Sequence, residues 1–424
     1  MMMDKKALTK VQAIAIVIII VIAAIAGGVY YQSTQKPAAP PEEKKIKIGL
    51  ILPLTGGLAA LGKECLTGYV LATEEINAAG GIKSLGGAKV ELVIADSKSD
   101  PKVAASECER LIMREGLKVI MGSYGSTLAY TASEVAERNK VIYWESGGTA
   151  DALTERGFKY LFRVVPKVKQ YVEQTFKFLK EYYLPNVGLK PEETKIAIAC
   201  ENTLYGQTWA NVTRILAKNA QMKIVLDEAY PSQSTDLSPL ITKLKAASPD
   251  VVVFIPYVTD AILFFRQAEQ LGFYAKCYIT CGGTALEDFV KALDDKTEGI
   301  MVSSFWSYDT ALPDVDKLND MFVAKYGGKH AGIYTGVSYI GAMSLYRVLE
   351  AAGSMDPDKI IDAAMKMDID PPGICGYGLK FDPIEHQNQK ATVWVLQWQG
   401  GTLRTIYPPS YAKVKPIWEM PKWK

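Results

Sequence analysis

The chain has 424 residues, of which 49% are hydrophobic and 22% charged, as in ordinary globular proteins. Lysine and arginine number 48 against 46 acidic residues, so the net charge gives no reason to expect nucleic acid as a partner. The two histidines, His330 and His386, exclude a zinc site built on several histidines. At roughly 100–200 residues per domain, the length predicts two to four domains.

The N-terminal segment is predicted to be a signal anchor or a signal peptide over residues 1–30. Three lysines precede an uncharged run whose centre, Ala13–Val29, is almost entirely isoleucine, valine and alanine. Its length lies between a signal-peptide core and a membrane span. We expect an uncleaved anchor with its positive end inside, and cleavage near Ala24-Ile25-Ala26 is the alternative.

Residues 31–45 are polar and rich in proline. Such a segment cannot bury enough apolar surface to fold, so we expect an extended linker. The remainder of the chain would then be extracytoplasmic, tethered to the cell membrane by the N-terminal segment, or secreted if that segment is cleaved.

From residue 46 onward, short apolar runs alternate with amphipathic helical patterns. Runs such as 46–52, 119–122, 141–144 and 251–255 are continuous rather than alternating, which is typical of strands buried on both faces of a parallel sheet. Their repeated alternation with helices predicts an α/β fold with doubly wound parallel sheets.

The number of strands is too large for one sheet, so two lobes joined by a multi-crossing hinge are predicted. Residues 299–424 are too few and too mixed for a third domain, and they are expected to finish both lobes. The predicted division is lobe 1 over 46–167, lobe 2 over 168–298, a return to lobe 1 over 299–353, and completion of lobe 2, hinge and C-terminal tail over 354–424. Two such lobes form a cleft at the carboxyl ends of their strands, where ligands bind.

The motifs that carry enzyme chemistry are absent from the sequence. It contains no GxxxxGK[ST], GxSxG or HExxH, and the loop Thr55–Gly62 lacks the GxGxxG spacing of a dinucleotide site. Neither histidine has the surroundings of a catalytic base, and we expect both at the surface. The sequence therefore predicts no enzyme, no catalytic residue, no metal and no cofactor.

Two polar loops follow successive predicted strands. Residues 122–127 read Gly-Ser-Tyr-Gly-Ser-Thr and residues 145–149 read Glu-Ser-Gly-Gly-Thr, each before a helical pattern. Hydroxyls and free backbone N–H groups at helix starts form a seat for a small anion such as a carboxylate. Taken singly, Ser126 and Thr149 could equally be plain helix N-caps.

Several motifs resemble those of a known family. They are Ile46–Gly57, Glu74–Gly81, Asp96–Pro101, Thr154–Gly157, Tyr160–Arg163, Tyr205-Gly206-Gln207 and Ser234–Asp250. In this order and spacing, residues 46–400 resemble the leucine/isoleucine/valine-binding proteins, which are type I periplasmic binding proteins. The resemblance implies a receptor that closes two lobes on a ligand and presents it to the permease of an ABC importer.

The resemblance also implies ligand-binding positions. On lobe 1 it implies a carboxylate held by the Ser126 hydroxyl, the Gly147 backbone and the Thr149 hydroxyl. It places aromatic contacts at Tyr205, Tyr257 and Tyr334. Two further positions depart from the family pattern: Leu61 replaces an aromatic residue, and Cys281, or Gly282 beside it, replaces the carboxylate that pairs with a ligand ammonium.

The absence of an acidic residue at position 281 or 282 affects which ligand is predicted. An ammonium that is desolvated without a counter-charge is strongly disfavoured. Asp260 or Glu287 is the candidate substitute for the missing carboxylate. We expect a small carboxylate or amino-acid-like ligand. An amide, urea-like or aromatic acid ligand is an alternative, as is a role as the ligand-sensing component of a signalling complex.

Overall fold

The computed structural model describes residues 9–34, 44–232, 234–310 and 312–423. It divides into two units, residues 1–44 and 45–424, and most of the predicted linker lies outside the described residues. In the first unit, helix α1 spans Lys10–Thr34, and its stretch Lys10–Val29 is long and apolar enough to cross a membrane. An N-terminal signal sequence has the same properties, so α1 fits either a signal peptide or an anchor.

Lobe 1 is built on a five-stranded parallel sheet in the order β2-β1-β3-β4-β5. Its strands are β1 (Lys45–Leu52), β2 (Lys89–Asp96), β3 (Val119–Gly122), β4 (Ile142–Glu145) and β5 (Leu161–Arg163). Its helices are α2 (Ala59–Ala78), α3 (Pro101–Met113), α4 (Ser126–Arg138), α12 (Ile333–Ala352) and α13 (Pro357–Lys366).

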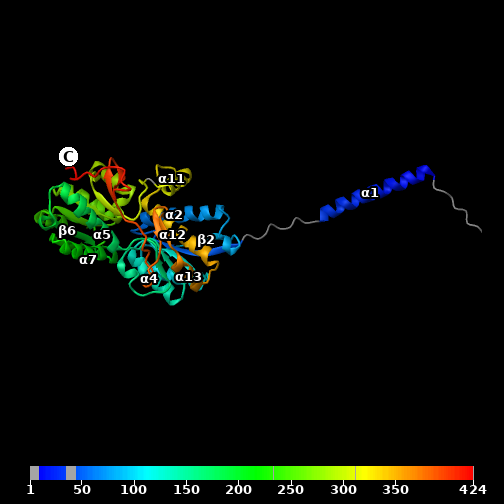
Figure 1. The fold of residues 1–424 in the computed structure, drawn as a ribbon, viewed down its shortest axis with the longest axis horizontal. Helices are drawn as coiled ribbons and strands as arrows, with labels where there is room; N and C mark the ends of the chain where they lie inside the picture. Colours follow the sequence, from blue (N-terminus) through cyan, green and yellow to red (C-terminus); the bar gives the residue numbers. More distant parts are fainter. Residues whose placement is uncertain (1–8, 35–43, 233, 311, 424) are drawn as a thin grey trace, which may run out of the picture. The chain divides into compact units, whose positions relative to one another are not determined.

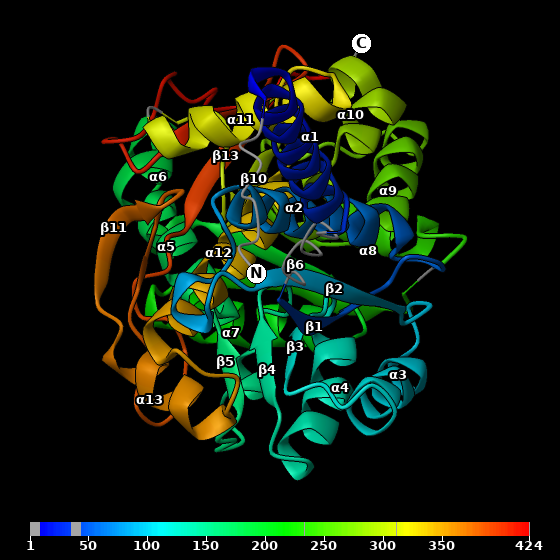
Figure 2. The ribbon, with the colours of Figure 1, turned by 90° about the vertical axis from the view of Figure 1, so that its right-hand side faces the viewer.

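Helices cover both faces of this sheet. Along β3 and β4, Ile120 and Tyr143 pack in the cluster with α3 and α4, whereas Met121 and Trp144 pack in the cluster with α2 and α12. Figure 2 shows α2 on one side of the strands and α3 and α4 on the other. The continuous apolar runs therefore reflect burial on both faces, which confirms the predicted doubly wound fold.

Lobe 2 is built on a seven-stranded sheet in the order β14-β13-β10-β9-β8-β6-β7. Its strands are β6 (Lys195–Glu201), β7 (Lys223–Tyr230), β8 (Val251–Ile255), β9 (Cys277–Thr280), β10 (Met301–Ser304), β13 (Trp394–Gln399) and β14 (Thr402–Tyr407). Its helices are α5 (Val168–Phe178), α7 (Leu204–Asn219), α8 (Ser238–Ala247), α9 (Val258–Gln270) and α10 (Glu287–Leu293). Figure 1 shows β6, α5 and α7 at one end of the second unit and β2, α4 and α13 at the other.

The crossings between the lobes differ from the predicted division in two places. Strand β10 pairs with β9 and with β13, so the chain does not return to lobe 1 at residue 299. It first meets lobe 1 through residues 313–326, where Lys317 and Lys325 pair with Glu75 and Glu74 of α2, and then joins it with α12. Helix α13, which was assigned to lobe 2, the hinge and the tail, packs on α12. Both β10 and α13 pack on the neighbouring element that buries their apolar side. Boundaries placed from the length of the chain do not take this packing into account.

Two of the chain segments that cross between the lobes lie side by side. Residues 163–165 run beside 386–388: the Arg163 N–H donates to the His386 carbonyl at 3.0 Å, and the Asn388 N–H donates to the Arg163 carbonyl at 2.9 Å. His386 is therefore buried, with its ring stacked on Phe162 at 4.3 Å, and its predicted surface position was wrong. His330 is half-buried and stacks on Tyr308.

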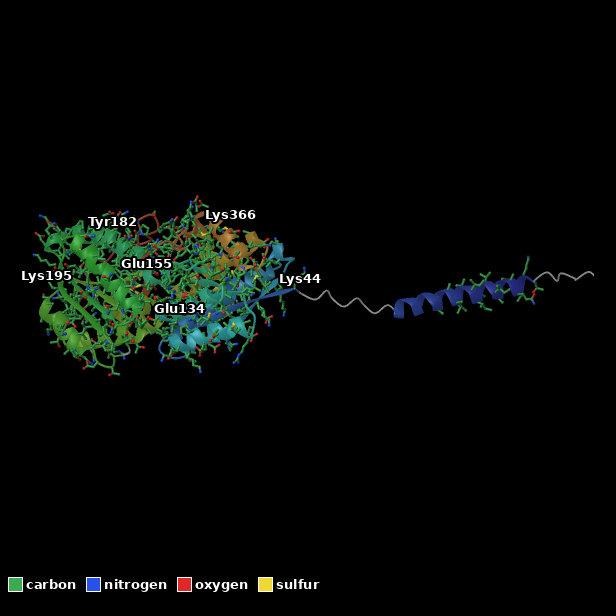
Figure 3. The ribbon with its side chains drawn as sticks, turned by 90° about the horizontal axis from the view of Figure 1, so that it is seen from below. Lys44, Glu134, Glu155, Tyr182, Lys195 and Lys366 are labelled. Atoms are coloured by element: carbon green, nitrogen blue, oxygen red, sulfur yellow. The ribbon has the colours of Figure 1, made fainter. Side chains whose placement is uncertain are left out.

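Three further elements lie after β5. They are α6 (Leu184–Asn186), α11 (Pro313–Tyr326) and a two-stranded ribbon of β11 (Ile369–Ile374) and β12 (Tyr377–Leu379). Figure 3 places Glu134 and Lys366 on lobe 1, and Tyr182 and Lys195 on lobe 2. All six cysteines are described; each is buried and has a free thiol.

Candidate functional site

A small cavity lies where the two lobes meet. It is lined by Tyr124, Gly125, Ser126, Gly147, Thr149, Tyr171, Tyr205, Tyr257, Cys281, Gly282, Phe305 and Tyr334. Of the eight positions singled out in the sequence, seven are in this lining. They come from both lobes and from segments that are far apart in the sequence.

The eighth position, Leu61, does not line the cavity. It lies in the first turn of α2, is fully buried, and packs in the hydrophobic core of lobe 1. Tyr124, an aromatic residue that is not among the predicted site residues, lines the cavity instead. Its ring meets that of Tyr334 edge-on at 5.0 Å. Tyr124 belongs to the polar loop 122–127, and its place in that loop is the sequence feature that could have identified it as a site residue.

The lobe 1 wall consists of the two polar loops. Because β3 and β4 are parallel neighbours, their carboxyl ends reach the same edge of the sheet. The Ser126 hydroxyl oxygen accepts the N–H of Thr149 at 3.2 Å and the N–H of Ala150 at 3.1 Å. Ser126 is the first residue of α4, whose N-cap is Gly125, so it joins the two loops rather than capping its own helix.

A buried glutamate stands directly behind this wall. Glu145, at the end of β4, accepts the backbone N–H groups of Gly147 and Gly148 at 2.5 Å each and that of Ser123 at 2.8 Å. Its side chain is fully buried, and burial raises the pKa of this carboxyl to about 7. In the sequence, Glu145 stands out only as the first residue of the polar loop 145–149.

The lobe 2 wall is mainly aromatic. Tyr205 lies at the start of α7 and Tyr257 is the N-cap of α9, and their ring centres are 6.1 Å apart. Cys281 follows β9 and is buried, which raises the pKa of its thiol to about 12. Burial also raises the pKa of both tyrosines. These groups are therefore neutral at physiological pH.

One tyrosine connects the lobes across the cavity. Tyr334, from α12 on lobe 1, donates its hydroxyl to the carbonyl of Gly282 on lobe 2 at 2.7 Å. Gly282 lies in the short 3₁₀ helix η5 (Gly282–Ala285). The lobes are thus in contact through the site itself.

The lining carries no charged side chain among the described residues. Neither residue named as a substitute for the missing carboxylate lines it: Asp260 lines a wider cleft that adjoins the cavity, and Glu287 lines a separate groove. The wider cleft shares Gly125 and Tyr257 with the cavity. It has a volume of about 640 Å³ and is lined mostly by hydroxyl-bearing residues.

The cavity itself is nearly filled by its own side chains. The centre of a water molecule can occupy only about 20 Å³ of it, which is about the space that a single water needs. Any larger ligand therefore requires the rings or the lobes to move apart, and the wider cleft lies directly next to the cavity.

Comparisons with known proteins agree with this architecture. Residues 45–402 match the family described as periplasmic binding protein. The chain is 35% identical over 376 residues to Leu/Ile/Val-binding protein homolog 8 of Brucella melitensis biotype 1, covering 87% of this chain and 92% of the relative.

Solved structures show the same fold. LivJ, the branched-chain amino acid transporter substrate-binding protein of Streptococcus pneumoniae, in complex with isoleucine, is 25% identical with a TM-score of 0.74, over 86% of this chain and all of LivJ. The leucine-binding protein LivK of Thermotoga maritima is 24% identical with a TM-score of 0.75, over 85% and 97% of the two chains.

These relatives are solute-binding proteins and not enzymes, and the family implies a location outside the cytoplasm. The two-lobed fold, the interlobe cavity and the match over most of the chain lead to one conclusion. This chain belongs to the leucine/isoleucine/valine-binding family of type I periplasmic binding proteins, and it is a solute-binding receptor.

Proposed function

We propose that this receptor serves an ABC importer of the branched-chain-amino-acid type and binds one small solute by closing its two lobes. The observation that carries the proposal is the convergence of Ser126, Gly147 and Thr149 from lobe 1 with Tyr205, Tyr257 and Cys281 from lobe 2 on one cavity. The sequence predicts that the solute is a small carboxylate or is amino-acid-like. The uncharged lining favours the amide, urea-like or aromatic alternatives over a ligand with an ammonium group.

Closure and binding are coupled in this proposal. The ligand first meets the hydroxyls of lobe 1, and lobe 2 then adds Tyr205 and Tyr257. Because these contacts exist only in the closed form, the ligand shifts the population toward closure. The hydrogen bond from Tyr334 to the Gly282 carbonyl joins the two lobes directly, so it stabilises the closed form whether or not a ligand is bound. The closed receptor is then presented to the permease.

Helix α1 is proposed to tether the receptor to the membrane. Its apolar stretch Lys10–Val29 has the length of a span. Mass spectrometry of the protein from its native membrane decides between anchor and signal peptide: an intact N-terminus supports the anchor, and a new N-terminus after residue 26 contradicts it. A co-purified signalling protein in place of a permease would support the sensing role instead.

The binding function is tested by a ligand screen on the purified receptor. Acids, amino acids and amides are compared by thermal shift, and small molecules released on denaturation are identified by mass spectrometry. A ligand at 100 times its Kd stabilises the folded state by about 2.7 kcal/mol, so one chemical class should raise the Tm by a few degrees. A screen with no shift, together with no released small molecule, would contradict the proposal.

A further inference from the structure

The backbone N–H groups at the rim of lobe 1 already have acceptors from the protein itself. Glu145 accepts three of them, and the Ser126 hydroxyl oxygen accepts two more. These N–H groups belong to Ser123, Gly147, Gly148, Thr149 and Ala150. An incoming carboxylate would need these same donors, since among the described residues no cationic side chain lines the cavity.

The charge behind this wall is also unfavourable to an anion. Arg163 is buried nearby, but its guanidinium donates to Gln387, to the Ala150 carbonyl and to the Thr154 hydroxyl. Asp151 and Glu145 both act on Arg163 as negative charges. Lys167 and Lys169 also act on Asp151, while Glu155 and Glu385 also act on Arg163. Three cations among four acids offer no surplus positive charge, and like charges at a few ångströms repel strongly where water is excluded.

We infer that Glu145 determines the charge class of the ligand: by holding the amides of Gly147 and Gly148, it makes the site select an uncharged carboxamide or urea group over the corresponding carboxylate. This inference rests on the proposed receptor function and names the ligand class of the same cavity. Glu145 acts as a specificity-determining residue behind the wall, and the hydroxyls in front of it make the contacts.

The groups that remain in the cavity suit a neutral polar ligand. The Ser126 hydroxyl accepts two N–H groups, so its proton is still available to a ligand carbonyl. Tyr171 lines the cavity, and its buried hydroxyl has no hydrogen-bond partner among the described residues. A hydroxyl both donates and accepts, and a carboxamide or urea likewise offers both a carbonyl oxygen and N–H groups, whereas a carboxylate only accepts.

The test compares matched pairs of ligands that differ only in the charged group. Benzamide with benzoate, isobutyramide with isobutyrate, and phenylacetamide with phenylacetate are measured on the full chain by thermal shift and calorimetry at pH 7.5. We expect the amide of the best-binding pair to bind at least about tenfold more tightly than its acid. An acid that binds as tightly as its amide, or more tightly, would overturn the inference.

Two variants test whether Glu145 causes the preference for amides over acids. Glu145→Ala frees the amides and should shift the amide-to-acid ratio of affinities toward the acid by about tenfold or more. The matched control is Glu201→Ala, which removes a buried glutamate at a strand end of lobe 2 and should leave that ratio unchanged. An unchanged ratio in a folded Glu145→Ala protein overturns the inference.

The wild-type comparison does not depend on whether either variant folds. Mass spectrometry of the solute that is released from the purified protein adds a second readout. A released carboxylic acid overturns the inference and leaves the receptor function intact. If neither the ligand pairs nor any released solute bind, the proposed receptor function fails instead.

Discussion

Each lobe carries a buried glutamate at the carboxyl end of a strand; neither glutamate lines the cavity, and their hydrogen bonds differ. Glu145 ends β4 in lobe 1 and Glu201 ends β6 in lobe 2; both are fully buried, and burial raises the pKa of each carboxyl to about 7. Glu145 is saturated by three backbone N–H groups. Glu201 accepts the Thr203 hydroxyl and the Gly206 N–H, and its second oxygen has no hydrogen-bond partner among the described residues.

This difference separates a preorganised wall from a wall that completes the site on closure. In lobe 1 the loops are held together by Glu145 and Ser126 before any ligand arrives, so the positions of the hydroxyls are fixed. In lobe 2 the surface consists of tyrosine rings and Cys281, and it meets the ligand only when the lobes close. Lobe 1 should therefore set the chemistry of the ligand, and lobe 2 its shape.

The largest expected effect separates the core of lobe 1 from its wall. Leu61→Ala removes a fully buried side chain from the core and should lower the free energy of unfolding by about 2–5 kcal/mol, with ligand affinity unchanged. Tyr257→Phe on the lobe 2 wall should lower affinity with little effect on stability. Denaturant unfolding and calorimetry measure both. If the folded Leu61→Ala protein lost ligand affinity, Leu61 would have to be counted among the site residues after all.

The second prediction uses pH to compare the two glutamates. Since folding raises the pKa of Glu145 from 4.5 to about 7, its contribution to stability is complete below pH 4.5 and is lost as the pH rises through 7. Each such group contributes on the order of 1–3 kcal/mol to this change. Glu145→Gln and Glu201→Gln should each flatten the fall in unfolding free energy between pH 5 and pH 8. If the unfolding free energy of the variants fell with pH as steeply as that of the wild type, the prediction would be contradicted.

The third prediction concerns the hydroxyls of the lobe 1 wall. Ser126→Ala with Thr149→Val removes two contacts to the ligand and should lower affinity by roughly 10- to 100-fold. The double variant should also lose about 1–3 kcal/mol of stability, because the N–H groups of Thr149 and Ala150 lose their acceptor. Thr149→Val alone keeps that acceptor and serves as the control. Calorimetry showing wild-type affinity in the double variant would remove both residues from the site.

The smallest expected effect concerns the contact across the lobes. Tyr334→Phe removes the hydroxyl that donates to Gly282, which should favour the open form and weaken ligand binding by a few fold. Tyr346→Phe on the same helix is the control, because its hydroxyl bonds to Thr73 within lobe 1. Small-angle scattering should show a larger radius for Tyr334→Phe alone. Equal radii for the two variants would contradict a closing role.

Much of the fold could be predicted because it depends on local patterns. Continuous apolar runs indicated strands buried on both faces, and the polar loops after β3 and β4 indicated which strand ends carry the site. The boundary at residue 299 could not be predicted in this way. Strand β10 joins the lobe 2 sheet because an edge of β9 is open to it, and the position of that edge is a property of the assembled sheet.

The sequence alone determined that the chain has an apolar N-terminal helix, two doubly wound lobes and a polar rim at Ser126 and Thr149. The tertiary structure alone decided what that rim can bind. Whether an N–H group is free depends on which side chains reach it, and the packed loops bring the Glu145 carboxylate onto the amides of Gly147 and Gly148. Residue types and their spacing state which groups are present; only the folded chain shows which of them are already satisfied.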